Sequence, residues 1–118
     1  MARYLLFAFS DCNDPAREAE FNDWYDNTHL PDMLGVPGMI EASRWESAEP
    51  SQQQRRKYLA LYTLETDDVE EFDKQVQIKG KWTMDQERFS DLPVFDPPDI
   101  PRVYKQILPT MKAGQPGK

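Results

Sequence analysis

Two short segments of the chain, residues 3–10 (RYLLFAFS) and 57–64 (KYLALYTL), are apolar at almost every position. Each is too short for a free-standing helix, so both are predicted to be β-strands. Successive side chains of a strand point to opposite faces. In the second segment Leu59 and Leu61 therefore share one face while Ala60 points to the other. A sheet containing these strands needs cover on both faces.

The segment after the first strand has the features of an amphipathic helix. Asp14 followed by Pro15 is a typical helix start, with a capping side chain and a proline at the first helical position. Residues then recur at i, i+3, i+4 and i+7 on one face, namely Phe21, Trp24, Tyr25 and Thr28. Because a residue before proline avoids the α region, Pro31 should end or bend this helix near Leu30.

The remaining elements complete a recognisable order. Residues 39–47 and 101–108 are predicted to be strands, and a second helix begins at residues 66–68. Gly80 is expected to break this helix. The resulting order, β-α-β-β-α-β, is that of the ferredoxin-like α+β fold, a four-stranded antiparallel sheet with two helices on one face.

The length of 118 residues predicts one domain with one core, over residues 1–110, followed by a flexible tail at 111–118. A polar stretch at 49–56 is predicted to be a hairpin loop. Residues 91–101 hold four prolines, which should keep this extended loop out of both sheet and helix and near the mouth of a pocket.

Two helices can cover only one face of this sheet, although both faces are apolar. A second copy of the chain is the simplest cover for the other face, so we expect a homodimer. A charge placed at Ala60 would test whether its face forms the interface.

The net charge of −7 argues against partners that carry negative charge. An acidic surface repels phosphate backbones and anionic lipid, so neither nucleic acid nor a membrane surface is an expected partner. The longest apolar run, residues 4–9, is far too short to span a bilayer and has no basic segment before it. The single cysteine, Cys12, cannot form an internal disulfide, which favours a reducing, cytoplasmic location.

Candidate chemistry gathers in residues 21–38, FNDWYDNTHLPDMLGVPG. His29, the only histidine, follows Tyr25 by four residues, so both rings project from one side of the helix. Near a helix C-terminus the dipole would favour the protonated imidazole. Either His29 transfers protons, or it caps the helix by a hydrogen bond to a backbone carbonyl.

The segment EFNDWYDNTHLPDML, followed by VPG and ASRW, resembles the EthD-like group of dimeric α+β barrel proteins over residues 18–45. The resemblance implies a ligand cavity between the sheet and its own helices. It also implies functional roles for Tyr25, His29, Asp32 and Arg44. The group includes cofactor-free dehydratases, cyclases, lyases, isomerases and some oxygenases.

Each of these side chains also has a structural alternative. Arg44 either clamps a substrate anion or pairs with one of the chain's acidic residues. Asp32 either orients His29 or is a solvated turn residue. Large aromatic residues either line a substrate pocket or belong to the core, and the ones in question are Trp24, Tyr62, Trp82 and Phe95. The acidic neighbours of Cys12 disfavour a nucleophilic thiolate.

The sequence offers no support for a metal or a bound cofactor. It has no glycine-rich nucleotide motif and no H-E-x-x-H motif, and one histidine with one cysteine makes a zinc site improbable. His29 as an axial haem ligand is disfavoured, because the acidic chain offers little basic lining for haem propionates.

Together with these residues, the resemblance implies an enzyme without a cofactor, namely a lyase, dehydratase or isomerase for a small aromatic or polyketide-like molecule. His29 would be the general base or acid, Tyr25 a hydrogen-bond donor to an oxyanion, and Arg44 an anion clamp. Two alternatives stay open. In the first, the chain is a non-catalytic small-molecule-binding or stress-associated module. In the second, it is a cofactor-free oxygenase on the same scaffold.

Overall fold

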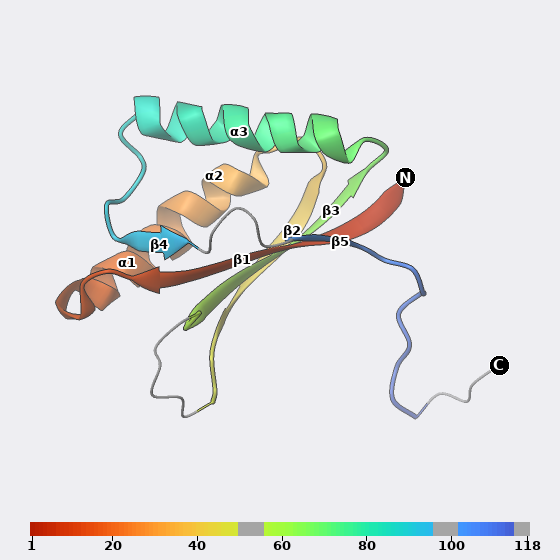
Figure 1. Cartoon of the computed structure of the whole chain (residues 1–118), viewed down its shortest axis with the longest axis horizontal. Coiled ribbons are helices and arrows are strands. Elements are labelled where there is room, and N and C mark those ends of the chain that lie inside the picture. Colours follow the sequence, from red (N-terminus) through yellow and green to blue (C-terminus); the bar gives the residue numbers. More distant parts are fainter. Residues whose placement is uncertain (50–55, 96–101, 115–118) are drawn as a thin grey trace.

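An antiparallel sheet with helices on one of its faces forms the structure, a computed structural model that describes residues 1–49, 56–95 and 102–114 (Figure 1). The strand order is β2-β3-β1-β4, and β5 also pairs with β1. The strands are β1 (Ala2–Cys12), β2 (Met39–Glu46), β3 (Tyr58–Thr66), β4 (Pro93–Phe95) and β5 (Val103–Lys105). The helical segments are η1 (Pro15–Arg17), α1 (Glu18–Trp24), η2 (Tyr25–His29), α2 (Leu30–Leu34) and α3 (Val69–Asp85). The predicted ferredoxin-like α+β fold is confirmed.

The fourth strand of this fold is present in two pieces along one edge of β1. β5 pairs with Tyr4–Leu6 of β1, and β4 pairs with Ser10–Cys12. The prediction that residues 91–101 stay out of the sheet was therefore wrong for Pro93–Phe95. Pro93 is tolerated because β4 is a short edge strand, where a missing N–H donor breaks no ladder bond on the outer side. Residues 96–101 lie outside the described residues, as do 50–55 of the predicted hairpin loop and 115–118 of the predicted tail.

The first helical stretch begins as predicted but does not end near Leu30. The Asp14 side chain accepts a hydrogen bond from the Ala16 N–H, and Pro15 is the first helical residue. Helical backbone then continues to Leu34 through one π-helical turn, in which the Leu30 N–H donates to the Tyr25 carbonyl five residues earlier. Because a proline removes one N–H and crowds the carbonyl four residues before it, Pro31 deforms the preceding turn rather than ending the helix.

The second helix, α3, runs unbroken from Val69 to Asp85, with the Asp68 side chain capping its N-terminus. Gly80, which was expected to break it, lies in the helix interior, where an added Cβ would meet no atom within 4 Å outside the adjacent helix backbone. A single glycine lowers helix stability by only about 1 kcal/mol, so packing of the remaining residues prevails.

The two faces of the sheet differ in their cover (Figure 1). On the helix side Tyr58, Ala60, Tyr62 and Leu64 of β3 are all buried. On the opposite face no helix of the described chain covers the side chains, and several large apolar residues are partly exposed. We call these residues the open face: Leu5, Phe7, Phe9, Trp45, Leu59, Leu61 and Tyr104.

The helix side holds the core, and Ala60 is 1% exposed within it. A charge at Ala60 would therefore disrupt the core of one chain, and it cannot report on an interface. The face that the described helices leave uncovered is the one carrying Leu59 and Leu61.

Two glycines give a matched test of this backbone. Gly38 has φ +98° and a Cβ there would lie 2.9 Å from the Glu65 carbonyl oxygen, whereas a Cβ on Gly80 meets no atom within 4 Å. Gly38→Ala should lower the free energy of unfolding by about 1–3 kcal/mol. Gly80→Ala should raise it by about 0.5–1 kcal/mol. Urea unfolding curves of the two variants measure both effects, and equal midpoints would contradict the expectation.

Candidate functional site

His29 lies at the centre of a group of aromatic rings between the helices and the sheet edge. Its ring stacks on Trp24 at a centroid distance of 4.7 Å and meets Tyr25 edge-on at 5.0 Å. Phe89 and Phe95 approach it at 5.8 and 6.2 Å. The structure thus brings together three of the predicted aromatic residues with His29, which is buried at 9% exposure.

The π-helical turn explains how neighbouring residues reach this arrangement. An α-helix places residues three and four apart on the same side. The wider π-turn also aligns residues five apart, and His29 follows Trp24 by five residues. Tyr25 and His29 remain on the buried side of the same turn. The turn therefore directs three rings into one site.

Burial keeps the His29 imidazole neutral. Desolvation is the largest effect and lowers the pKa of His29 to about 4, while the charge of Asp32 opposes this shift and that of Arg44 adds to it. The expectation that a helix C-terminus favours the protonated ring was wrong, because the helix continues past His29 to Leu34. At neutral pH this side chain can accept a proton.

The two buried tyrosines of the site stay protonated. Desolvation raises the pKa of Tyr25 to about 12, and the Arg44 charge and the Ser10 and Tyr62 hydroxyls offset it only in part. Desolvation likewise raises the pKa of Tyr62, with Tyr25 adding to the shift. Both hydroxyl groups therefore stay protonated at neutral pH and can donate a hydrogen bond.

Arg44 reaches under the helix from β2. Its Nη1 donates to the Asp26 carboxylate at 2.8 Å, and its Cζ lies 4.3 Å from the centre of the Tyr25 ring. The side chain is 13% exposed. One end of the guanidinium therefore forms the predicted ion pair with an acidic residue, and the clamp for a substrate anion stays a prediction.

Four buried polar atoms at this site have no hydrogen-bond partner among the described residues. They are Ser10 Oγ, Tyr25 Oη, Arg44 Nε and Arg44 Nη2. An unsatisfied buried polar group costs about 1–3 kcal/mol, so such a cluster indicates a place for a bound group. Sequence reasoning missed Ser10. Its signal was the strand period, because Ser10 follows Leu6 and Ala8 on the face that the helices cover.

Asp32 holds a neighbouring segment rather than His29. Its carboxylate accepts two hydrogen bonds from Arg88, at 2.7 and 3.0 Å. The Trp24 indole N–H donates to the Arg88 carbonyl at 2.8 Å. Together these contacts hold Arg88 in place. The ring of the next residue, Phe89, lies edge-on to the His29 ring. The predicted hydrogen bond that would orient His29 is absent from the contacts of Asp32 in the described chain.

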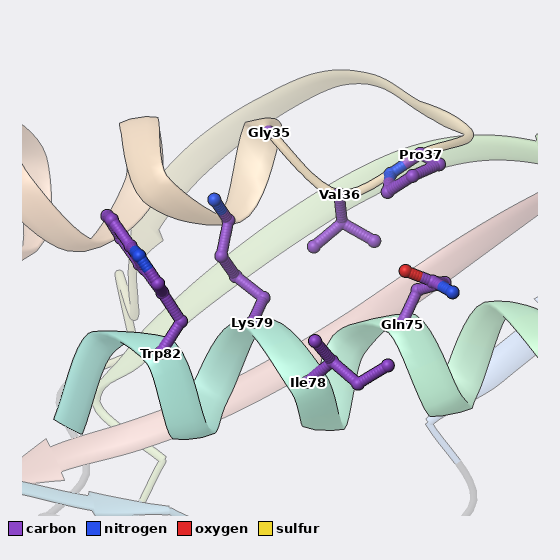
Figure 2. Close-up of a pocket in the computed structure, with 7 residues that line it drawn as sticks. All are labelled: Gly35, Val36, Pro37, Gln75, Ile78, Lys79 and Trp82. Atoms are coloured by element: carbon purple, nitrogen blue, oxygen red, sulfur yellow. The ribbon is translucent and has the colours of Figure 1, made fainter. Parts of the chain in front are cut away.

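Trp82 lies in a different place. It lines a groove of about 250 Å³ between the end of α2 and α3, and Figure 2 shows it with the other lining residues. Lys79 Nζ lies 4.5 Å from the centre of the Trp82 ring. The structure does not bring Trp82 into the ring group around His29. Cys12 donates to the Asp14 carbonyl at 3.2 Å and also lies apart from it.

The stability of the fold should depend on pH through His29. The unfolded imidazole, with a pKa near 6.5, binds a proton that the folded one accepts only near pH 4. Stability should therefore fall as pH drops from about 6.5 to about 4, by about 3 kcal/mol from this group. Urea unfolding at pH 7 and 4.5 should show this difference between the wild type and His29→Gln. The same pH dependence in both proteins would contradict it.

Two searches of the described residues bear on other kinds of site. No group of three or more histidine, cysteine, aspartate and glutamate side chains in the described chain is arranged to hold a metal ion. None of the helices in the same residues is long and apolar enough to cross a membrane.

No protein-family model matches the chain. Over 62 residues it is 44% identical to a protein named core atranone cluster protein 1 from Stachybotrys chlorohalonatus. This match covers 52% of the chain and 26% of that protein, so the matched part is about a quarter of the relative's length.

Solved structures share the fold at low sequence identity. HapK from Hahella chejuensis has a TM-score of 0.53 and 12% identity, over 98% of this chain and 100% of that one. A candidate antibiotic biosynthesis monooxygenase from Bordetella bronchiseptica has a TM-score of 0.52 and 16% identity, over 92% and 100%. An EthD family protein from Bacillus halodurans has a TM-score of 0.51 and 18% identity, over 91% and 100%. The chain therefore has the ferredoxin-like α+β fold of these proteins and resembles an EthD family protein in structure.

Proposed function

We propose that the chain is a cofactor-independent lyase, dehydratase or isomerase for a small aromatic or polyketide-like molecule. The observation that carries this proposal is a neutral, buried imidazole walled by aromatic rings, with unpartnered donors beside it. Aromatic walls favour planar apolar substrates, and a neutral imidazole is a general base.

In this proposal His29 removes a proton from a carbon next to a carbonyl group. The electron pair of the broken C–H bond moves to the carbonyl oxygen, which becomes an enolate. The imidazolium then returns the proton to another carbon, which is isomerisation, or to a departing hydroxyl group that leaves as water, which is dehydration. No oxidant or reductant is needed for either outcome.

Tyr25 would stabilise the enolate. The Tyr25 hydroxyl stays protonated and makes no hydrogen bond of good geometry in the described chain, although the Ser10 and Tyr62 hydroxyls lie close to it, so it can donate to the oxygen that gains charge. The Arg44 guanidinium, whose Cζ lies 4.3 Å from the centre of the Tyr25 ring, would clamp a second, anionic group of the substrate. As the enolate forms beside His29, its negative charge favours the imidazolium and offsets the low pKa of the free site.

The comparisons support a role in processing small molecules. The relative is named for the core atranone cluster, and one structural neighbour is a candidate antibiotic biosynthesis monooxygenase. A homodimer that covers the open face, and a cytoplasmic location consistent with the single free Cys12, belong to the same proposal.

A panel of phenolic and polyketide-like compounds tests the reaction class. The protein is incubated with each compound without added cofactor, under ¹⁸O₂, beside His29→Gln, and products are followed by mass spectrometry. Products that are isomers or have lost water, formed by the wild type alone, are expected. Incorporation of ¹⁸O would favour the oxygenase alternative, and saturable binding without any product would favour the binding module.

A further inference from the structure

We infer that the deep end of this site binds a carboxylate group of the ligand through Arg44 and Ser10. The inference rests on the proposed function, because it names the class of molecule that the same site takes. It adds Ser10 as a residue that determines specificity.

The two sides of the Arg44 guanidinium have different surroundings. Nη1 is held by the Asp26 carboxylate at 2.8 Å, while Nε and Nη2 are buried and have no hydrogen-bond partner among the described residues. Nε and Nη2 form one side of the planar group, with two parallel N–H bonds. This side matches the two oxygens of a carboxylate, which lysine or a single hydroxyl donor cannot do.

The buried hydroxyl group of Ser10 adds to this donor set from another element. Ser10 belongs to β1 and is 2% exposed, and Tyr25 of the π-helical turn, which is 0% exposed, lies beside it. Neither hydroxyl makes a hydrogen bond of good geometry among the described residues, although the two lie close enough to interact. A carboxylate offers about four lone-pair positions, so it can accept from the guanidinium side and from Ser10, and the one O–H of Tyr25 is left for the enolate oxygen.

The positive charge of Arg44 and the aromatic rings around it favour an organic anion as the ligand. Asp26 is 55% exposed and pairs with Nη1 of Arg44, so the Nε and Nη2 side of the guanidinium has no negative partner among the residues that the structure describes. The rings of Phe21, Tyr25 and Tyr58 lie 5.7, 4.3 and 5.2 Å from Arg44 Cζ. A strongly hydrated inorganic anion would lose its water among these rings, whereas an aromatic acid brings an apolar body that they can pack against.

A matched pair of probes tests this inference without any knowledge of the natural substrate. 2-Naphthoate and 2-naphthamide have nearly the same shape and differ in charge, and calorimetry gives both dissociation constants. The wild type is expected to bind the acid at least about tenfold more tightly than the amide. Arg44→Lys should remove most of this preference, and Ser10→Ala should reduce it about threefold or more. Arg17→Lys, an exposed arginine paired with Glu20, and Ser43→Ala, on the open side of the sheet, are the controls.

Equal binding of acid and amide by the wild type would overturn the inference, because it would mean that water alone satisfies these donors. An equal loss in Arg17→Lys or Ser43→Ala would do the same. If Arg44→Lys fails to fold, Ser10→Ala decides. His29→Gln separates the two proposals, since it should lose turnover and keep the acid preference. If His29→Gln loses turnover but the wild type shows no preference for the acid, the carboxylate subsite alone is refuted. If the wild type prefers the acid but His29→Gln keeps its turnover, the role of His29 alone is refuted.

Discussion

Replacing His29 with glutamine is expected to lower turnover by at least about 100-fold while the fold is kept, because glutamine can hydrogen-bond but cannot carry a proton. General acid–base catalysis contributes about 10²- to 10⁴-fold. The wild-type rate should rise with pH through the pKa of about 4 and stay level above it, because only the neutral imidazole is a base. The glutamine variant should lack this limb. Steady-state kinetics between pH 3.5 and 8 on the first compound that reacts measures both effects.

Circular dichroism of the same variant is the control for folding. A variant that keeps near-normal turnover but melts several degrees lower would mean that His29 is structural. That outcome would favour a structural role for His29, whose ring stacks on Trp24 at a centroid distance of 4.7 Å.

Replacing Leu61 with aspartate is expected to raise the dissociation constant of a homodimer by at least about 100-fold. Leu61 lies on the open face beside other apolar side chains, and a charge buried there without a partner is costly. Sedimentation should give twice 13.8 kDa for the wild type at micromolar concentration and 13.8 kDa for the variant. Ile78→Asp, on the exposed side of α3, is the control because Ile78 is 61% exposed and lies away from the open face. A wild type that sediments as a single chain would refute the dimer.

The order of helices and strands could be predicted because it depends on local patterns. The apolar runs gave β1 and β3, and Asp14 with Pro15 gave the start of the first helix. The π-helical turn could not be predicted, because it depends on both the effect of Pro31 on the helix backbone and the packing of the buried rings. β4 was missed because pairing with β1 is a long-range contact, which outweighed the preference of a proline-rich segment for a loop.

The candidate site was predictable where its residues are close in sequence. Trp24, Tyr25 and His29 follow from helical spacing, and Arg44 from the resemblance. Phe89 and Arg88 lie about sixty residues further along the chain than His29, and nothing local indicates that they return to it. Trp82 has the right residue type, but α3 directs it to another groove.

The titration of the single imidazole by NMR tests the central claim most directly, because it needs no substrate. With the protein labelled with ¹⁵N at histidine, the ring resonances of the folded state are followed from pH 8 down to pH 3.5. A buried, neutral His29 should show no change between pH 8 and 6 and a midpoint near 4. A midpoint near 6.5, the ordinary value for an exposed histidine, would contradict the buried site on which the proposed function depends.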